Sequence, residues 1–499
     1  MSERRATYTF GPLERHGLLG PVRGGQAAWL AAGTLTAIGL LDQAPSLGGL
    51  LAALAALAVA LGTSFVPLGG RSGAEWCPVL SAFAGRRLRG QTRFVSPAAA
   101  AGVVARGLDR GRHATVSPPA PAAPPQLGGV RIVEVDYRHR TIGALSEQAG
   151  RRLTAVLACR VLAFSLLDAD AQERRLSRWG HVLSGLGGTA VRRIQWIERT
   201  APAAGDELAR WVHAERDPSV PLRGTPMIDS YLELIGTTTR ATQAHEILIA
   251  VQVDARRARD RSGVSLSETL VETTERVAKG LQAAEVTVLG ALGPPQLART
   301  LRTAFDPYAG SELARLQAAD PGRDGLEEAG AWPLGACEGW DHYRSDGAVH
   351  ATYWIGAWPR VEVSPLFMNA LLGGSSAVRA VAVSFEPLPA DRSTREVEAA
   401  ITRDRADREL RARFGQSETA RQRQAREATV RREAELAAGH GEVRFSGFVT
   451  VSGRDGDDLR RSCSEVLDLA ARAHLELHRL YGQQADAFTF TLPLGRGLR

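Results

Sequence analysis

Two apolar runs near the N-terminus constrain this chain more than any other feature. The first covers residues 27–41 and the second residues 47–66, with a polar turn at residues 42–46 between them. The second run is long enough to cross a bilayer core of about 30 Å, whereas the first needs residues 24–26, a tilt or local thinning to do so. The pattern therefore predicts a two-helix membrane hairpin.

Arginines flank the outer ends of both runs, and none lies in the turn. The basic residues that we expect beside the membrane are Arg15, Arg23, Arg71, Arg86, Arg87 and Arg89. By the positive-inside rule, both ends of the hairpin face the cytoplasm. A cleaved signal peptide fits less well, because the apolar region begins late and a second run follows it. Two alanine-rich helices buried in a soluble protein are the remaining alternative.

The formal net charge of +7 would suggest nucleic-acid binding if it were spread over the chain. Residues 1–112 contain 12 Arg and 5 acidic residues, which accounts for the whole excess, so the remainder is neutral. A basic region beside an apolar hairpin favours a membrane surface over a DNA groove. We therefore expect membrane lipid as a partner and no direct nucleic-acid binding.

Lysine and cysteine usage exclude several enzyme classes. Lys279 is the only lysine, and its Val-Ala-Lys-Gly context lacks the Gly-Lys-Ser/Thr ending that a phosphate-binding P-loop requires. The four cysteines contain no C-x-x-C pair, so neither a zinc ribbon nor a disulfide framework is indicated. We expect a non-enzymatic protein in a reducing compartment, with no catalytic residue, cofactor or metal.

Proline and glycine usage divides the chain into four parts. Residues 1–111 hold the hairpin and its basic flanks, and residues 112–127 form a proline-rich linker that no helix or central strand tolerates. We expect a first soluble domain at residues 128–330 and a second at residues 331–499. The fold class expected is α+β: the membrane hairpin followed by mixed α/β domains built of β-α-β units.

Hydrophobic periodicity assigns elements to both domains. In the first we predict strands at 130–137, 153–163, 191–197 and 246–253, and helices at 169–186, 206–239, 267–284 and 295–304. In the second we predict strands at 349–355, 361–363, 378–385 and 443–451, helices at 366–372 and 392–438 with a break near Gly415, a helix at 457–481 and a closing strand at 487–494. The charged stretch 392–438 mixes both signs, which is typical of a solvated helical pair.

Three groups of side chains are candidates for a catalytic or metal-binding site. His474 and His478 have the i, i+4 spacing of helical zinc ligands, but no third ligand is indicated and a structural role is favoured. Ser375 lies in a Gly-Gly-Ser-Ser turn that backbone geometry explains. Around a predicted hairpin turn at Asp346, His342 and His350 are expected to face each other on adjacent strands. None of these demands catalysis.

Several segments resemble components of conjugative secretion systems. YTFGPLER at residues 8–15, the apolar hairpin, and FVPLGGR at residues 65–71 resemble the actinobacterial PrgI-like family of type IV secretion components. WIER at residues 196–199, residues 353–359 and residues 482–494 are similar to the non-catalytic N-terminal half of VirB-type conjugation ATPases. In those ATPases a P-loop domain follows, and it is missing from this chain.

This resemblance implies an adaptor at the cytoplasmic membrane whose soluble part lies in the cytoplasm. It implies several copies within a secretion complex, and a separately encoded VirB-type P-loop ATPase that docks near residues 487–499. The alternative is a scaffold of a type VII secretion membrane complex similar to EccE, which also joins two N-terminal membrane helices to a soluble body. Both expectations are of a structural protein.

Overall fold

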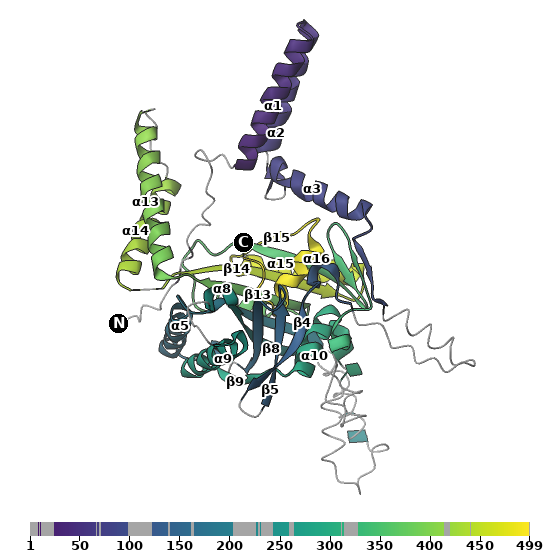
Figure 1. Cartoon of the computed structure of the whole chain (residues 1–499), viewed down its shortest axis with the longest axis vertical. Coiled ribbons are helices and arrows are strands. Elements are labelled where there is room, and N and C mark those ends of the chain that lie inside the picture. Colours follow the sequence, from purple (N-terminus) through teal and green to yellow (C-terminus); the bar gives the residue numbers. More distant parts are fainter. Residues whose placement is uncertain are drawn as a thin grey trace, which may run out of the picture. The chain divides into compact units, whose positions relative to one another are not determined.

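The computed structural model describes residues 8, 10, 24–65, 67–68, 71–97, 122–137, 140–160, 164–202, 226–227, 230, 243–258, 264–310, 312–313, 328–413, 420–439 and 441–498 (Figure 1). The chain divides into two compact units. The sheet unit comprises Met1–Phe10, Arg93–Val397 and Arg431–Arg499, and the helical unit comprises Gly11–Thr92 and Glu398–Val430.

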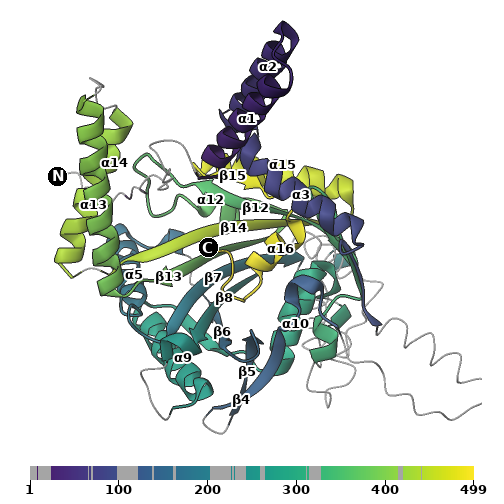
Figure 2. The ribbon, with the colours of Figure 1, turned by 45° about the horizontal axis from the view of Figure 1, so that its top comes forward.

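A 13-stranded sheet forms the centre of the sheet unit, and every neighbouring pair in it is antiparallel. The order is β3-β10-β11-β12-β14-β13-β7-β8-β6-β5-β4, with β15 beside β12 and β9 beside β6 (Figure 2). The strands are β3 (Arg93–Val95), β4 (Arg131–Tyr137), β5 (Arg140–Glu147), β6 (Arg152–Arg160), β7 (Val191–Pro202), β8 (Gln243–Asp254), β9 (Thr287–Ala291), β10 (Gly335–Glu338), β11 (Tyr343–Ser345), β12 (Ala348–Ala357), β13 (Val378–Pro387), β14 (Val443–Gly453) and β15 (Glu476–Arg479).

The sheet is built from one motif used twice. The first copy runs β6-α5-β7-β8-α9-β9, with α5 at Ala169–Ser184 and α9 at Leu266–Ala283, and its strands lie in the order β9-β6-β8-β7. The second copy runs β12-α12-β13-β14-α15-β15, with α12 at Asn369–Gly373 and α15 at Gly456–Arg472, and its strands lie in the order β15-β12-β14-β13. Both have the split β-α-β arrangement of ferredoxin-like folds.

The duplication extends beyond the core motif. A hairpin precedes each copy, β4-β5 in the first and β10-β11 in the second, and a helix follows each, α10 (Pro294–Phe305) and α16 (Gln484–Phe488). The copies join through their second strands, where β7 pairs with β13 and Ile197 lies opposite Ala382. The rings of Phe305 and Phe488, which end the two equivalent helices, meet with centroids 5.1 Å apart.

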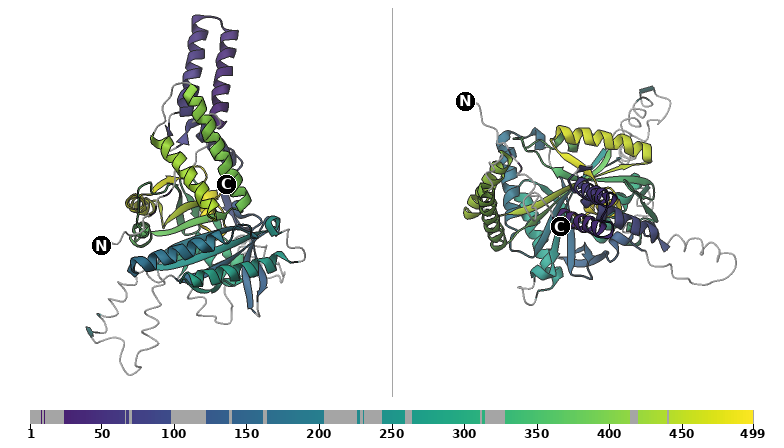
Figure 3. Two further views of the ribbon diagram at one scale, coloured as in Figure 1. Left: turned by 90° about the vertical axis from the view of Figure 1, so that its left-hand side faces the viewer. Right: turned by 90° about the horizontal axis from the view of Figure 1, so that it is seen from above.

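One face of the sheet is covered by helices from both copies. Leu183 of α5 and Leu281 of α9 pack against β7 and β8, while Leu459 of α15 packs against β12 and β14. Trp196 contacts both clusters, so they form one continuous layer. The helices α5 and α9 lie side by side in this layer (Figure 3). Their N-termini are capped by Asp168 and Ser265, which satisfy otherwise unpaired N–H groups.

The opposite face is covered by α10, α16 and residues 489–498, which we call the C-terminal segment. Beneath this segment, the strands carry a set of buried polar side chains that we call the polar row, consisting of Thr154, Gln195, Gln252, Thr352, Ser384 and Thr450. Buried polar groups cost free energy unless they form hydrogen bonds. The main chain of the C-terminal segment supplies several of these bonds, so the polar row specifies its path.

Hydrogen bonds to the polar row run along the C-terminal segment. Gln195 Nε2 donates to the Phe490 carbonyl at 2.7 Å, and Gln195 Oε1 accepts from Gly495 N at 2.8 Å. Gln252 Nε2 donates to the Leu494 carbonyl at 2.7 Å, and Ser384 Oγ donates to the Arg496 carbonyl at 2.8 Å. The segment therefore binds strands of both copies.

The remaining elements complete the chain. In sequence, α13 (Ala390–Arg413) and α14 (Ala420–Ala437) stand between β13 and β14 of the second copy; the corresponding stretch between β7 and β8 of the first copy lies largely outside the described residues. The others are α1 (Gly24–Gln43), α2 (Leu47–Phe65), β1 (Pro67–Leu68), β2 (Arg71–Ser72), α3 (Gly73–Leu88), α8 (Ala255–Ala258) and the 3-10 turns η1 (Pro125–Leu127), η2 (Phe164–Leu166), η3 (Pro307–Ala309), η4 (Glu328–Ala331) and η5 (Thr489–Thr491).

The predicted mixed α/β fold is confirmed, and the elements with strong periodicity are found within a few residues of their predicted bounds. The β-α-β units differ from expectation because each has a third strand inserted between its two parallel strands, which leaves every direct pairing antiparallel. The strands β5 and β9 were not predicted. Most of the helical stretch at residues 206–239, and residues 112–121 of the linker, lie outside the described residues.

The prediction for the end of the chain is wrong. The helix expected at residues 457–481 ends at Arg472, and β15 follows it. Residues 487–494 are not a strand: α16 and η5 occupy most of them, and Thr489 and Thr491 donate hydroxyl hydrogen bonds to the carbonyls of Asp486 and Phe488. Val363, expected in a paired strand, instead forms an isolated bridge with Tyr8.

The C-terminal segment should be required for stability. We expect Leu494→Ala to lower the free energy of unfolding by about 2–5 kcal/mol, because Leu494 is fully buried and the substitution leaves a cavity. Leu289→Ala is the matched control, since Leu289 is 58% exposed and should change stability by about 0.5 kcal/mol or less. Chemical denaturation measures both. Equal, small effects would show that the segment is not part of the core.

Candidate functional site

The helices α1 and α2 form a closely packed hairpin. Gly33 lies against Ala60, so closely that a Cβ at Gly33 would be 2.3 Å from the Ala60 Cβ. Trp29 Nε1 donates to Thr63 Oγ1 at 2.7 Å, and Gln26 Nε2 donates to the Ser64 carbonyl at 2.7 Å. Small residues and interhelical hydrogen bonds are how helices associate in lipid.

The outer surface of this hairpin is apolar. Its exposed large apolar side chains are Trp29, Leu35, Ile38, Leu41, Leu47, Leu50, Leu51, Leu54, Val59, Leu61 and Phe65. A soluble protein rarely leaves so many large apolar side chains together in water. By length and composition α2 is suited to cross a membrane, with a mean hydropathy of 2.0, and it is the only such helix among the described residues. The helix α1, which contains the first apolar run, does not meet the same criteria of length and composition.

The structure describes some of the basic residues that are predicted to lie beside the membrane. Arg86 and Arg87 lie in the last turn of α3 and Arg89 is its C-cap, where cations stabilise the helix dipole. Arg71 lies in β2, and its side chain is outside the description, as are Arg15 and Arg23. Glu75 Oε2 accepts the N–H of Ser72 at 2.9 Å and caps the start of α3.

The segments before and after the hairpin both belong to the sheet unit. On the C-terminal side, β3 pairs with β10, and Ser96 N donates to the Leu334 carbonyl at 2.8 Å. On the N-terminal side, Tyr8 and Val363 exchange two backbone hydrogen bonds of 3.0 Å each. The hairpin therefore leaves one folded body and returns to it.

Phe10 anchors the N-terminal side further. Its ring lies 5.4 Å from Trp358, 5.5 Å from Phe367 and 6.2 Å from Phe445 between ring centroids. Its backbone N–H donates to the Pro359 carbonyl at 3.3 Å. Aromatic pairs at these separations contribute beyond the burial of area. Both flanks of the hairpin are therefore joined to the same folded body.

The side chains weighed as catalytic or metal ligands serve structural roles. His474 follows α15 with a φ of 56°, and His478 lies on β15 against Trp354, so the two do not share a helix face. Ser375 Oγ accepts the Ala377 N–H at 2.9 Å, as a turn residue does. Within the described part of the chain, no three potential ligands cluster for a metal. Lys279 is exposed on α9.

The turn at Asp346 and Gly347 is confirmed, but the histidine pairing is not. His350 lies opposite Tyr343, while His342 sits outside the strand and bonds Asp341 through Nδ1 at 2.8 Å. The reason is the register set by the turn, which pairs Ser345 with Ala348 and Tyr343 with His350, so that position 342 would lie opposite position 351. His350 is fully buried, with Nδ1 2.8 Å from Ser452 Oγ and Nε2 3.0 Å from the Phe305 carbonyl oxygen. Burial lowers the pKa of His350 to about 4.

Residues 241–355 match a family model described as "Putative type VII ESX secretion system translocon, EccE". They extend from β8 to β12 and make up roughly a quarter of the chain. No curated protein matches this sequence. This match supports the EccE-like alternative, and together with α2 it places the chain in the cytoplasmic membrane.

The expected relationship to PrgI-like and VirB-type proteins is wrong, because the family match is to a type VII component instead. That resemblance rested on short segments that lie almost entirely outside the matched residues. The VirB-type P-loop ATPase loses its basis as a partner. Its expected docking surface near residues 487–499 is largely buried inside the fold, where Ala487 and Leu494 are fully inaccessible.

Three features went unrecognised in the sequence: the polar row, the Phe10 anchor and the path of the C-terminal segment. A signal existed for the first, since Gln195 and Gln252 interrupt otherwise apolar strands at core-facing positions. The anchor had a weaker signal, the aromatic residues Tyr8 and Phe10 in the polar stretch that precedes the hairpin. The partners of both are distant in sequence, and no local pattern identifies them.

His350 should make stability depend on pH. The folded pKa of about 4 lies below the ordinary value of about 6.5, so the unfolded chain binds the proton more readily. The contribution of neutral His350 to the free energy of unfolding should be fully present above about pH 6.5 and should be lost as the pH falls toward 4. Between pH 7 and pH 5 we expect His350 to account for a loss of roughly 2 kcal/mol.

Denaturation of the wild type and of His350→Gln at both pH values measures this loss. The variant should show a shallower pH dependence, whereas His181→Gln, at an exposed histidine on α5, should keep the wild-type slope. Identical slopes in all three would contradict the assignment.

Proposed function

We propose that this protein is a non-catalytic scaffold of a type VII secretion membrane complex, held in the cytoplasmic membrane by the hairpin with its sheet unit in the cytoplasm. The observation that carries the proposal is the match of residues 241–355 to the EccE family model. The apolar hairpin supports it, because membership of a translocon complex requires a place in the membrane.

The position of the matched residues also supports a structural role. They include β8 and α9 of the first copy and β10, β11 and most of β12 of the second, which are framework elements of the sheet. Buried residues such as Leu248, Leu270 and Ala351 belong to this stretch. A family resemblance in framework residues favours a common fold over a common catalytic site.

A scaffold needs no chemistry of its own, and we expect none. This expectation is supported by the positions of Ser375, which caps a turn, and of Lys279, which is exposed on α9. The partners proposed are membrane lipid around α1 and α2, the other subunits of the secretion complex, and further copies of this chain within it. Nucleic acid is not expected among them.

The proposed topology predicts which cysteines a membrane-impermeant maleimide reaches in intact cells. Gln43→Cys, in the exposed turn region of the hairpin, should be labelled from outside. Arg151→Cys, exposed on the sheet unit, should be labelled only after the membrane is permeabilised. The exposed native Cys77 is replaced by Ala in both forms. Labelling of Arg151→Cys in intact cells would place the sheet unit outside and reject the topology.

Loss of the chain should abolish type VII secretion. In a deletion strain we expect the full chain to restore export and to co-purify with the other membrane subunits. A form in which residues 24–65 are replaced by an unrelated membrane hairpin separates anchoring from recognition, because it keeps the sheet unit at the membrane. Normal export without the chain, or its absence from the isolated complex, would refute the proposal.

A further inference from the structure

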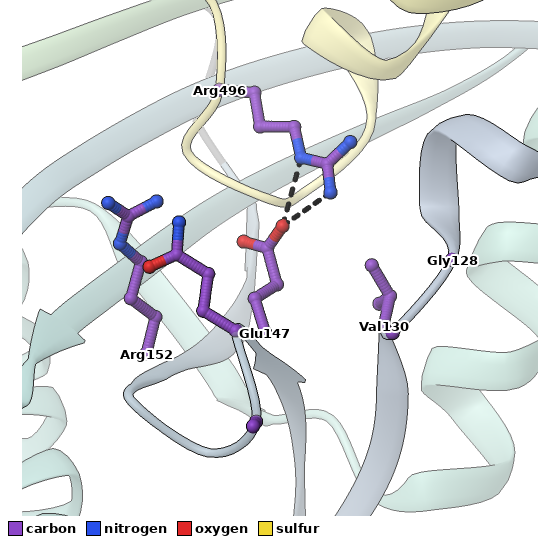
Figure 4. A pocket seen from close by; sticks show the side chains of 8 residues that line it. Gly128, Val130, Glu147, Arg152 and Arg496 are labelled. Atoms are coloured by element: carbon purple, nitrogen blue, oxygen red, sulfur yellow. Dashed lines mark hydrogen bonds and ion pairs between the residues drawn. The ribbon is translucent and has the colours of Figure 1, made fainter.

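A pocket of about 320 Å³ opens beside the turn between β5 and β6 (Figure 4). It lies in the sheet unit, on the side of the sheet where the C-terminal segment ends. The residues that matter to the argument are Gly128, Val130, Glu147, Gln148, Arg152 and Arg496. The turn is conformationally unusual, since Gln148 and Ala149 have positive φ values of 53° and 55°. Such backbone is held by its surroundings and is found often at binding sites.

Positive charge is in excess near this pocket. Arg152 Nε and Arg192 Nη1 both bond the same oxygen of Asp254, at 3.2 Å and 3.1 Å, so two guanidinium groups share one carboxylate. Arg192 Nε is buried without a hydrogen-bond partner. Although burial opposes ionisation, a hydrogen bond from Arg256 N and the two guanidinium groups hold the pKa of Asp254 below its ordinary value. One positive charge remains uncompensated.

Glu147 does not supply the missing negative charge. Its Oε1 accepts from Arg496 Nε at 2.9 Å, and its Oε2 accepts from Gln252 Nε2 at 3.3 Å, so the carboxylate is already paired (Figure 4). The Nη groups of Arg152 form no hydrogen bond to another described residue, and neither does the side-chain amide of Gln148. These donors border the pocket and are free to bind an acceptor.

We propose that this pocket binds the phosphate of a small phosphoester, with Arg152 and Gln148 as the donors. A guanidinium group presents two parallel N–H groups that match phosphate oxygens. The volume is at the lower end for small-ligand pockets and suits a phosphate with a short attached group. The proposal is independent of the secretion role. A free metabolite and a phospholipid headgroup carry this same chemistry, and the experiment separates them.

The test uses the full-length protein in neutral detergent and sn-glycerol 3-phosphate as the probe. Calorimetric titration should show saturable binding. Arg152→Gln should weaken it by about tenfold or more, and Gln148→Glu should do the same by adding a negative charge. Arg160→Gln is the matched control, because it removes an equal charge from an exposed side chain of the same strand that does not line the pocket. It should change affinity by about twofold or less.

Gln148→Glu keeps the test decisive if Arg152→Gln fails to fold, because Gln148 is exposed and forms no structural side-chain bond. In a second arm, thermal unfolding is compared in nanodiscs of phosphatidylcholine with and without phosphatidylglycerol. Stabilisation by phosphatidylglycerol that is lost in Gln148→Glu identifies a lipid headgroup, and binding in the first arm alone identifies a soluble phosphoester. Absence of binding in both arms, or equal losses in the Arg160→Gln control, would overturn the proposal.

Discussion

The sheet unit depends on hydrogen bonds between the polar row and the C-terminal segment. Gln195, Gln252 and Ser384 come from β7, β8 and β13, and all three are almost completely buried. The segment covers these polar groups, and each would cost about 1–3 kcal/mol if it were buried there without its hydrogen bond. The C-terminal segment therefore completes a core whose strands lie between 112 and 300 residues earlier in the sequence.

The duplicated motif explains the position of the C-terminal segment on the sheet. The first copy ends in α10, from which Arg302 bonds Asp346 in the β11–β12 turn of the second copy. The second copy ends in the C-terminal segment, from which Arg496 bonds Glu147 beside the β5–β6 turn of the first copy. Each copy thus reaches across to the same place on the other. This reciprocal exchange, together with the β7–β13 pairing, joins the copies into one body.

Sequence reasoning succeeded where the information is local. The strand now called β8 and the helix α9 have strong periodicity and a capping box, and both were placed within a few residues. It failed at residues 487–494, where alternating apolar residues suggested a strand although α16 and η5 occupy most of these positions. It also failed for His474 and His478, because α15 ends at Arg472, His474 is itself left-handed and His478 lies in β15. In each case a distant contact decides the conformation.

In the proposed function the hairpin is a membrane anchor whose two flanks return to one body. The C-terminal segment closes that body. Hydrogen exchange of the full-length protein in detergent tests this closure most directly. If the C-terminal segment is integral, amides of residues 484–498 and of β7 and β8 should exchange slowly and with the same dependence on denaturant. Fast exchange of residues 484–498 while β7 and β8 stay protected would contradict the account.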